Sequence, residues 1–75
     1  MNPSEADLYR WVKVRDLNPG DVMIAWSEPV LVLGMSKYST NRVWIEVFNL
    51  LDGVDRRSLK WLDDTVCVVC RMVEV

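Results

Sequence analysis

The fold is decided by the stretch Val14-Arg-Asp-Leu-Asn-Pro-Gly-Asp-Val-Met-Ile24. Its centre has the chemistry of a tight turn, because Pro19 presets φ and Gly20 accepts the positive φ of a type II turn. Before the turn, Val12 and Val14 alternate with charged residues, and this alternation has the period of a β-strand. The stretch therefore predicts two short strands joined by a turn.

Short strands separated by turns continue along the rest of the chain. The predicted strands are residues 11–15, 21–26, 30–35, 42–50, 54–61 and 65–75, of which 54–61 also fits a helical turn. Asp52-Gly53 is a strong hairpin signal, and Asp63-Asp64 is typical of a turn. Gly34 interrupts an apolar run and indicates a bend or a bulge. Turns at such short intervals favour an all-β barrel or sandwich.

Apolar side chains indicate which face of each strand is buried. In residues 21–26 one face holds Val22, Ile24 and Trp26. In residues 42–50 one face holds Val43, Ile45 and Val47. Residues 30–35 are apolar on both faces, which predicts a strand buried on two sides.

The chain of 75 residues has room for a single domain, and its 51% hydrophobic content excludes disorder. We expect residues 11–75 to form a small β-barrel of five or six antiparallel strands. Residues 1–10 are expected to form an arm. Ser4 followed by Asp7 has the spacing of a helix start, which allows one helical turn over Glu5–Arg10.

Three segments together resemble a known family of barrels. They are the stretch Val14–Ile24, the run Glu28-Pro-Val-Leu-Val-Leu33 and the run Val47-Phe-Asn-Leu-Leu-Asp-Gly53. Residues 12–62 are similar to the small SH3-like barrels of the KOW type, including the N-terminal domain of translation elongation factor P. In that factor a functional loop lysine lies between glycines, whereas Lys37 here lies between Ser36 and Tyr38. The resemblance therefore implies the fold, and it does not extend the factor's function to Lys37.

Composition removes several function classes. The chain has no histidine, which is the commonest general base and a common metal ligand, and it has no glycine-rich phosphate loop. We therefore expect no enzyme activity, no metal site and no cofactor. Wholly apolar runs such as Val30–Leu33 are far shorter than the roughly 20 residues of a membrane-spanning helix. The first residues lack the features of a secretory signal, so a cytoplasmic location is expected.

Cys67-Val-Val-Cys70 matches the spacing of redox pairs and zinc sites. In a strand, however, three steps separate the two Cα atoms by about 10 Å, and a disulfide tolerates at most about 7 Å. Zinc would need two further ligands, for which only carboxylates are available. We expect both cysteines to be unlinked thiols that pack within a strand.

Trp44, Glu46 and Phe48 lie on the face opposite the predicted core positions of residues 42–50. A carboxylate between two aromatic rings needs a partner if it is buried, so either Arg42 or Lys60 pairs with Glu46 or this face is open. An open aromatic face is typical of an interaction surface, to which we add Trp11. The alternative is that the arm covers this face with Leu8, Tyr9 and Trp11.

A second candidate surface is basic. Residues 37–61 have a net charge of +2, whereas the whole chain has −2. The basic and aromatic residues of this segment are Lys37, Tyr38, Arg42, Arg56, Arg57, Lys60 and Trp61. Such a set can follow a nucleic-acid backbone and stack bases. The alternative is an ordinary solvated face on an acidic protein.

The sequence favours a non-catalytic β-barrel that acts as an adaptor or regulator through protein–protein contacts. Its small size is compatible with an inhibitor encoded by a phage or mobile element. The alternative function is a nucleic-acid-binding or ribosome-associated barrel that uses the basic segment. A redox protein or enzyme that uses the two cysteines is a third hypothesis.

Overall fold

The computed structural model describes residues 9–70 of the chain. Its elements are β1 (Tyr9–Lys13), the 3₁₀ turn η1 (Val14–Asp16), β2 (Val22–Ala25), β3 (Glu28–Lys37), β4 (Arg42–Asn49), β5 (Asp55–Trp61) and β6 (Thr65–Val69). The strands form one antiparallel sheet in the order β1-β6-β2-β3-β4-β5. The predicted all-β fold is therefore confirmed, and residues 54–61 are resolved as a strand.

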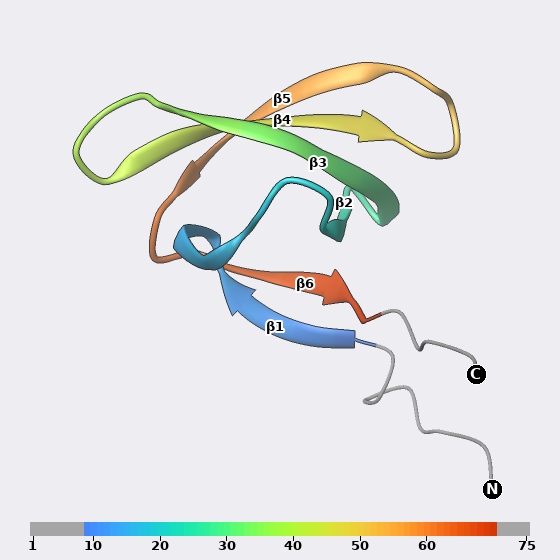
Figure 1. Cartoon of the computed structure of the whole chain (residues 1–75), viewed down its shortest axis with the longest axis horizontal. Coiled ribbons are helices and arrows are strands. Elements are labelled where there is room, and N and C mark those ends of the chain that lie inside the picture. Colours follow the sequence, from blue (N-terminus) through green and yellow to red (C-terminus); the bar gives the residue numbers. More distant parts are fainter. Residues whose placement is uncertain (1–8, 71–75) are drawn as a thin grey trace, which may run out of the picture.

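The sheet curls over on itself without closing. Figure 1 shows β3, β4 and β5 above β1 and β6, with β2 between the two groups. Within residues 9–70, β1 and β5 are the two edges and no ladder joins them. The curled sheet encloses a core of nine buried apolar residues, which are Val14, Leu17, Met23, Val30, Val32, Ile45, Val47, Val66 and Val68.

The two turns predicted from glycine chemistry are present. Gly20 has φ +98°, and the Asp21 N–H donates to the Asn18 carbonyl at 3.0 Å, as in a type II turn. Gly53 has φ +70° in the hairpin between β4 and β5. Because residues other than glycine rarely adopt these φ values, the glycine at each position favours the turn that forms there.

The turn between β2 and β3 was not predicted in this form. Ala25 pairs with Glu28, so Trp26 and Ser27 make a two-residue hairpin loop. Both have positive φ, 52° and 62°, which is the signature of a type I′ turn. The turn places Trp26 outside the sheet with 55% of its surface exposed, so this side chain does not belong to an apolar strand face.

The start of the barrel differs from the prediction. β1 begins at Tyr9 and ends at Lys13, so Tyr9 and Arg10 are extended and a helical turn does not include them. Glu5–Leu8 lie outside the described residues. Val14 is buried at the start of η1, where its N–H donates to the Asp64 carbonyl at 2.8 Å. The turn ends β1 early because it packs Val14 into the core.

The last strand also ends earlier than predicted. β6 ends at Val69, and residues 71–75 of the predicted strand 65–75 lie outside the described part. Among residues 9–70, no helix is long and apolar enough to span a membrane.

Two predicted burial patterns are wrong. In β2 the buried residue is Met23, whereas Val22 and Ile24 are only half-buried. In β3 the buried residues are Val30 and Val32, but Leu33 is 45% exposed, so only one face is covered. The predicted irregularity at Gly34 is present, because the pairing of β3 with β4 shifts register between Val32 and Gly34. Apolar side chains alone do not indicate which face a distant strand will cover.

Candidate functional site

The outer face of β4 carries the residues that the sequence singled out. Val43, Ile45 and Val47 alternate with Arg42, Trp44, Glu46 and Phe48 along this strand. Ile45 and Val47 are fully buried, which places the second set on the outer side of the sheet. Trp44 and Phe48 are half-buried and Glu46 is exposed. The face is therefore partly open.

Neighbouring strands extend this face on both sides. Cross-strand partners point to the same side of a sheet, so the register identifies the outer residues of β5 and β3. On β5 the partners of Arg42, Trp44, Glu46 and Phe48 are Trp61, Leu59, Arg57 and Asp55. On β3, Ser36 lies opposite Trp44 and Gly34 lies opposite Glu46.

Aromatic rings and guanidinium groups contact one another on this surface. The Arg57 guanidinium lies over the Trp44 ring at 4.5 Å, and the Arg42 guanidinium lies over the Trp61 ring at 4.0 Å. Tyr38 meets Trp44 edge-on, with 5.9 Å between ring centroids and 89° between planes. We call Tyr38, Arg42, Trp44, Arg57 and Trp61 the aromatic–arginine face. Each guanidinium lies over a ring at a distance typical of a cation–π contact, which holds it at the surface.

The two arginines of this face form no ion pair among the described residues. Between residues 9 and 70 the ion pairs are Arg15 with Asp63 and Arg56 with Asp52. Glu46 lies directly across from Arg57, yet the Arg57 guanidinium contacts the Trp44 ring and forms no ion pair in this part of the chain. The predicted pairing of Glu46 with Arg42 or Lys60 is likewise not among these ion pairs. The arginines therefore remain able to bind an anion or a planar group.

The structure unites parts of both predicted surfaces and separates the rest. Trp44, Glu46 and Phe48 from the protein-binding set share one face with Tyr38, Arg42, Arg57 and Trp61 from the nucleic-acid set. The nucleic-acid set contains adjacent residues, such as Arg56 and Arg57, that strand alternation divides between two sides.

Four predicted residues lie elsewhere. Lys37 and Lys60 are both partners of Val43, and Arg56 is the partner of Val47, so all three point to the side opposite the aromatic–arginine face. Trp11 belongs to β1, which pairs with β6. Tyr9 and Trp11 are 40% and 70% exposed there and do not cover Trp44, and Leu8 lies outside the described residues.

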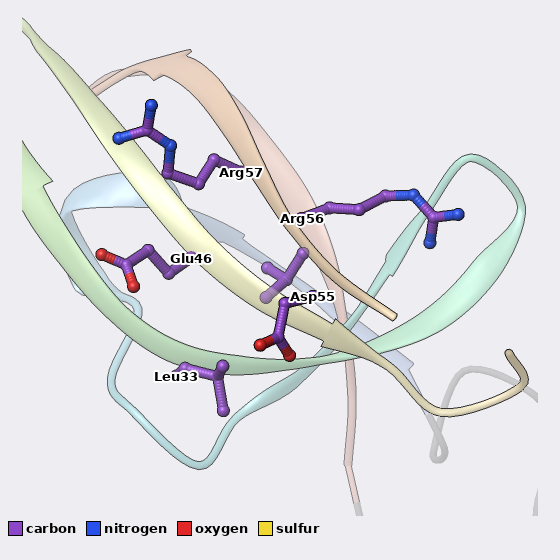
Figure 2. Close-up of a pocket in the computed structure, with 6 residues that line it drawn as sticks. Leu33, Glu46, Asp55, Arg56 and Arg57 are labelled. Atoms are coloured by element: carbon purple, nitrogen blue, oxygen red, sulfur yellow. The ribbon is translucent and has the colours of Figure 1, made fainter. Parts of the chain in front are cut away.

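Arg56 and Arg57 are neighbours in sequence with different surroundings. Figure 2 shows their side chains leaving β5 in opposite directions. The Arg56 Nη2 atom donates to Asp52 Oδ2 at 2.9 Å. This hydrogen bond lowers the pKa of Asp52 below its ordinary value of 3.8 and raises the pKa of Arg56. Arg56 is thus engaged within its own hairpin, whereas Arg57 is presented at the surface.

A shallow pocket of about 330 Å³ adjoins the aromatic–arginine face. Its lining residues are Leu33, Glu46, Val47, Asp55, Arg56 and Arg57 (Figure 2). Gly34 lies opposite Glu46 on β3, and a Cβ atom built at Gly34 would meet no heavy atom within 4 Å. The pocket was not predicted, although a glycine beside an exposed Leu33 in a strand is a signal of such an opening.

The cysteines are recorded as free thiols. Cys67 lies in β6 opposite Trp11 and Ile24, and Cys70 follows the end of that strand. No three His, Cys, Asp or Glu side chains of residues 9–70 gather in a way that could hold a metal ion.

Comparisons with known proteins bear on the fold. Neither a protein family nor a curated protein matches this sequence. Among solved structures, the chain is similar to a translation initiation factor eIF-5A family protein from Naegleria fowleri, with a TM-score of 0.72 and 10% sequence identity. The match covers 84% of this chain and 48% of that protein, so this chain spans about half its length. The expected resemblance to the barrels of translation factors is confirmed for the fold.

Proposed function

We propose that this barrel binds single-stranded RNA through the aromatic–arginine face. The observation that carries the proposal is that Arg42 and Arg57 are stacked on tryptophan rings without a carboxylate partner among the described residues. Proteins that bind single strands combine cationic groups for the backbone with aromatic side chains on which bases stack. This face supplies both kinds of group within one patch of β4, β5 and the loop after β3.

Exposure of the rings fits this role. Tyr38 is 55% exposed and Trp61 is 44% exposed, so each offers ring surface to a base. Trp44 is half-buried between Tyr38 and Arg57 and holds them in place. A guanidinium plane that rests on a ring can stack a base on its other side while its N–H groups reach phosphate oxygens.

The fold supports the same proposal. The similar structure is described as a translation initiation factor family protein, which is a class of protein that works beside RNA. We therefore favour RNA, and an association with the ribosome is a consistent setting. The mechanism is binding without catalysis: stacking gives most of the affinity, and the two arginines neutralise phosphates.

The test is a fluorescence anisotropy titration of a labelled, mixed-sequence RNA of about ten nucleotides, at about 50 mM salt. We expect Trp61→Ala to weaken binding roughly 5- to 100-fold, because base–aromatic stacking contributes about 1–3 kcal/mol. Trp26→Ala is the matched control, since this exposed tryptophan lies in the β2–β3 turn.

Arginine variants give a stricter comparison. Arg57→Ala should weaken binding, whereas Arg56→Ala should not, because Arg56 points away and is paired with Asp52. Thermal melts verify that each variant is folded. The proposal fails if the unaltered protein does not bind the strand, or if the two arginine variants lose affinity equally.

A protein-binding role is the second candidate, and Trp11 is the observation that favours it. Trp11 is 70% exposed on the edge strand β1, and exposed tryptophans are common anchors of protein interfaces. This surface is separate from the aromatic–arginine face, so both roles are compatible. An inhibitory action and an origin in a phage or mobile element stay predictions.

A further inference from the structure

We propose that the pocket beside the aromatic–arginine face binds guanine, with the Glu46 carboxylate contacting the edge of the base. This inference rests on the proposed function and names the base that the face selects. The pocket lies beside Trp44 and the Arg57 guanidinium that covers its ring, because Glu46 follows Trp44 by two residues on the outer face of β4. Two residues along a strand span about 7 Å, which is comparable with the width of a base.

The chemistry of the Glu46 carboxylate is complementary to one base in particular. The Watson–Crick edge of guanine presents the O6 acceptor followed by the N1–H and N2–H donors. A carboxylate accepts both donors with its two oxygens. Arg57, the cross-strand partner of Glu46, keeps its guanidinium over the Trp44 ring and leaves this carboxylate free. Uracil lacks the second donor and places a carbonyl oxygen against the carboxylate.

The Glu46 carboxylate is available for this contact. Glu46 is exposed and takes part in neither of the two ion pairs formed within residues 9–70. Arg57 is held over Trp44 instead of against Glu46. Had these groups formed an ion pair with each other, a base would have to separate them first. The carboxylate is therefore free to accept hydrogen bonds beside one apolar side chain, Leu33.

Gly34 follows the pocket-lining Leu33 on β3. It lies opposite Glu46, and any side chain there would point to the same side as Glu46. A Cβ at Gly34 would meet nothing within 4 Å, and its φ is not in the left-handed region. A larger residue at this position would therefore extend beside Glu46 without straining the backbone.

The experiment compares four RNA strands that differ at one position. Each is a uridine strand of about ten nucleotides with guanosine, inosine, adenosine or uridine at its centre, titrated by fluorescence anisotropy. We expect the guanosine strand to bind roughly 5- to 100-fold more tightly than the uridine strand, as for other bidentate base contacts. Inosine keeps O6 and N1–H but lacks the N2 amine, so its strand should bind with intermediate affinity.

Variants identify the side chains responsible. Glu46→Gln should remove the preference for guanosine while leaving the affinity for the uridine strand within about twofold, because glutamine replaces one acceptor by a donor. Gly34→Val should do the same by crowding the Glu46 side chain. Asp16→Asn is the matched control, since this exposed carboxylate belongs neither to the pocket lining nor to the two ion pairs of residues 9–70. Asp55→Asn tests the other carboxylate of the pocket, which lies opposite Phe48.

The outcomes separate this inference from the proposed function. Equal affinity for all four strands overturns the guanine site and leaves RNA binding intact. Loss of the preference in Asp55→Asn but not in Glu46→Gln also overturns it. Failure of every strand to bind overturns both proposals. A melt of each variant shows whether a lost preference comes from the pocket or from unfolding.

Discussion

Asn49 is fully buried and yet joins three parts of the barrel. Its Nδ2 atom donates to Glu28 Oε1 at 2.8 Å, which connects the end of β4 to the start of β3. Its Oδ1 atom accepts hydrogen bonds from the N–H groups of Leu51 and Asp52 at 2.7 and 3.2 Å. These hydrogen bonds hold the loop that leads to Gly53. One polar side chain thereby helps to set the direction in which β5 begins.

We predict that Asn49→Ala lowers the free energy of unfolding by about 2 kcal/mol, because it removes these bonds and leaves buried polar groups without partners. Urea unfolding measures the change. Asn41→Ala is the control: this exposed side chain forms one long bond, 3.3 Å from Ser39 Oγ, so its loss should stay within about 0.5 kcal/mol. Similar losses in both variants would contradict the structural role assigned to Asn49.

The burial of Asn49 could not be predicted from the sequence alone. The segment Val47–Gly53 identified the hairpin through Asp52-Gly53, because glycine at a positive φ is a local requirement. The partner Glu28 lies 21 residues earlier in the chain. Only the pairing of β3 with β4 brings the two side chains together, and local patterns do not contain that information.

At the scale of elements, the surroundings of each arginine in β5 depend on the alternation of side chains between the two sides of the sheet, more than on the charge of the segment. The basic residues of the segment 37–61 do not form one surface, because a strand places neighbouring residues on opposite sides. Arg57 therefore joins Trp44, and Arg56 turns back to Asp52. The sequence correctly indicated the strands and the glycine turns. The sequence left residues 54–61 open between a strand and a helical turn. The side of the sheet on which each arginine lies depends on which of the two forms.

The Asp52–Arg56 pair gives the β4–β5 hairpin a pH-dependent contribution. The hydrogen bond from Arg56 lowers the pKa of Asp52 in the folded state, so the unfolded chain takes up this proton first as the pH falls. The stabilisation is complete above the ordinary pKa of 3.8 and is lost as the pH drops through the lowered value.

We therefore predict that Asp52→Asn is less stable than the unaltered protein at about pH 6 and that the difference narrows at about pH 3. Urea unfolding at a series of pH values measures it. Asp55→Asn, in the same hairpin and outside the two ion pairs of the described residues, should show a smaller difference at pH 6. A difference for Asp52→Asn that is constant with pH would exclude the ion pair as its cause.

For the whole molecule, fold and surface are set by different residues. The barrel matches a solved structure with a TM-score of 0.72 at only 10% identity, so few specific side chains are needed to specify it. Turn residues and inward-facing apolar residues supply the side chains that specify this fold. Outward residues such as Trp44 and Arg57 are less constrained by the fold, and their aromatic–cation contact both stabilises the sheet and holds a guanidinium at the surface.

Net charge gives the last prediction. The chain has a net charge of −2, so attraction of RNA must come from a local patch and involve few phosphates. For single strands, the slope of log affinity against log salt is about −0.7 for each phosphate neutralised, which gives roughly −1.4 for Arg42 and Arg57. If all five basic residues of residues 37–61 took part, the slope would be about −3.5.

Titrations between about 50 and 300 mM salt distinguish these cases. Arg57→Ala should make the slope shallower by about 0.7, and Arg56→Ala should leave it unchanged, because Arg56 is engaged with Asp52 on the other side of β5. A slope near −3.5 would show that Lys37, Lys60 and Arg56 also contact the strand, which would place the binding surface on both sides of the sheet. A slope near zero would show that the arginines contact no phosphate, and their position over Trp44 and Trp61 would then serve only to orient the bases.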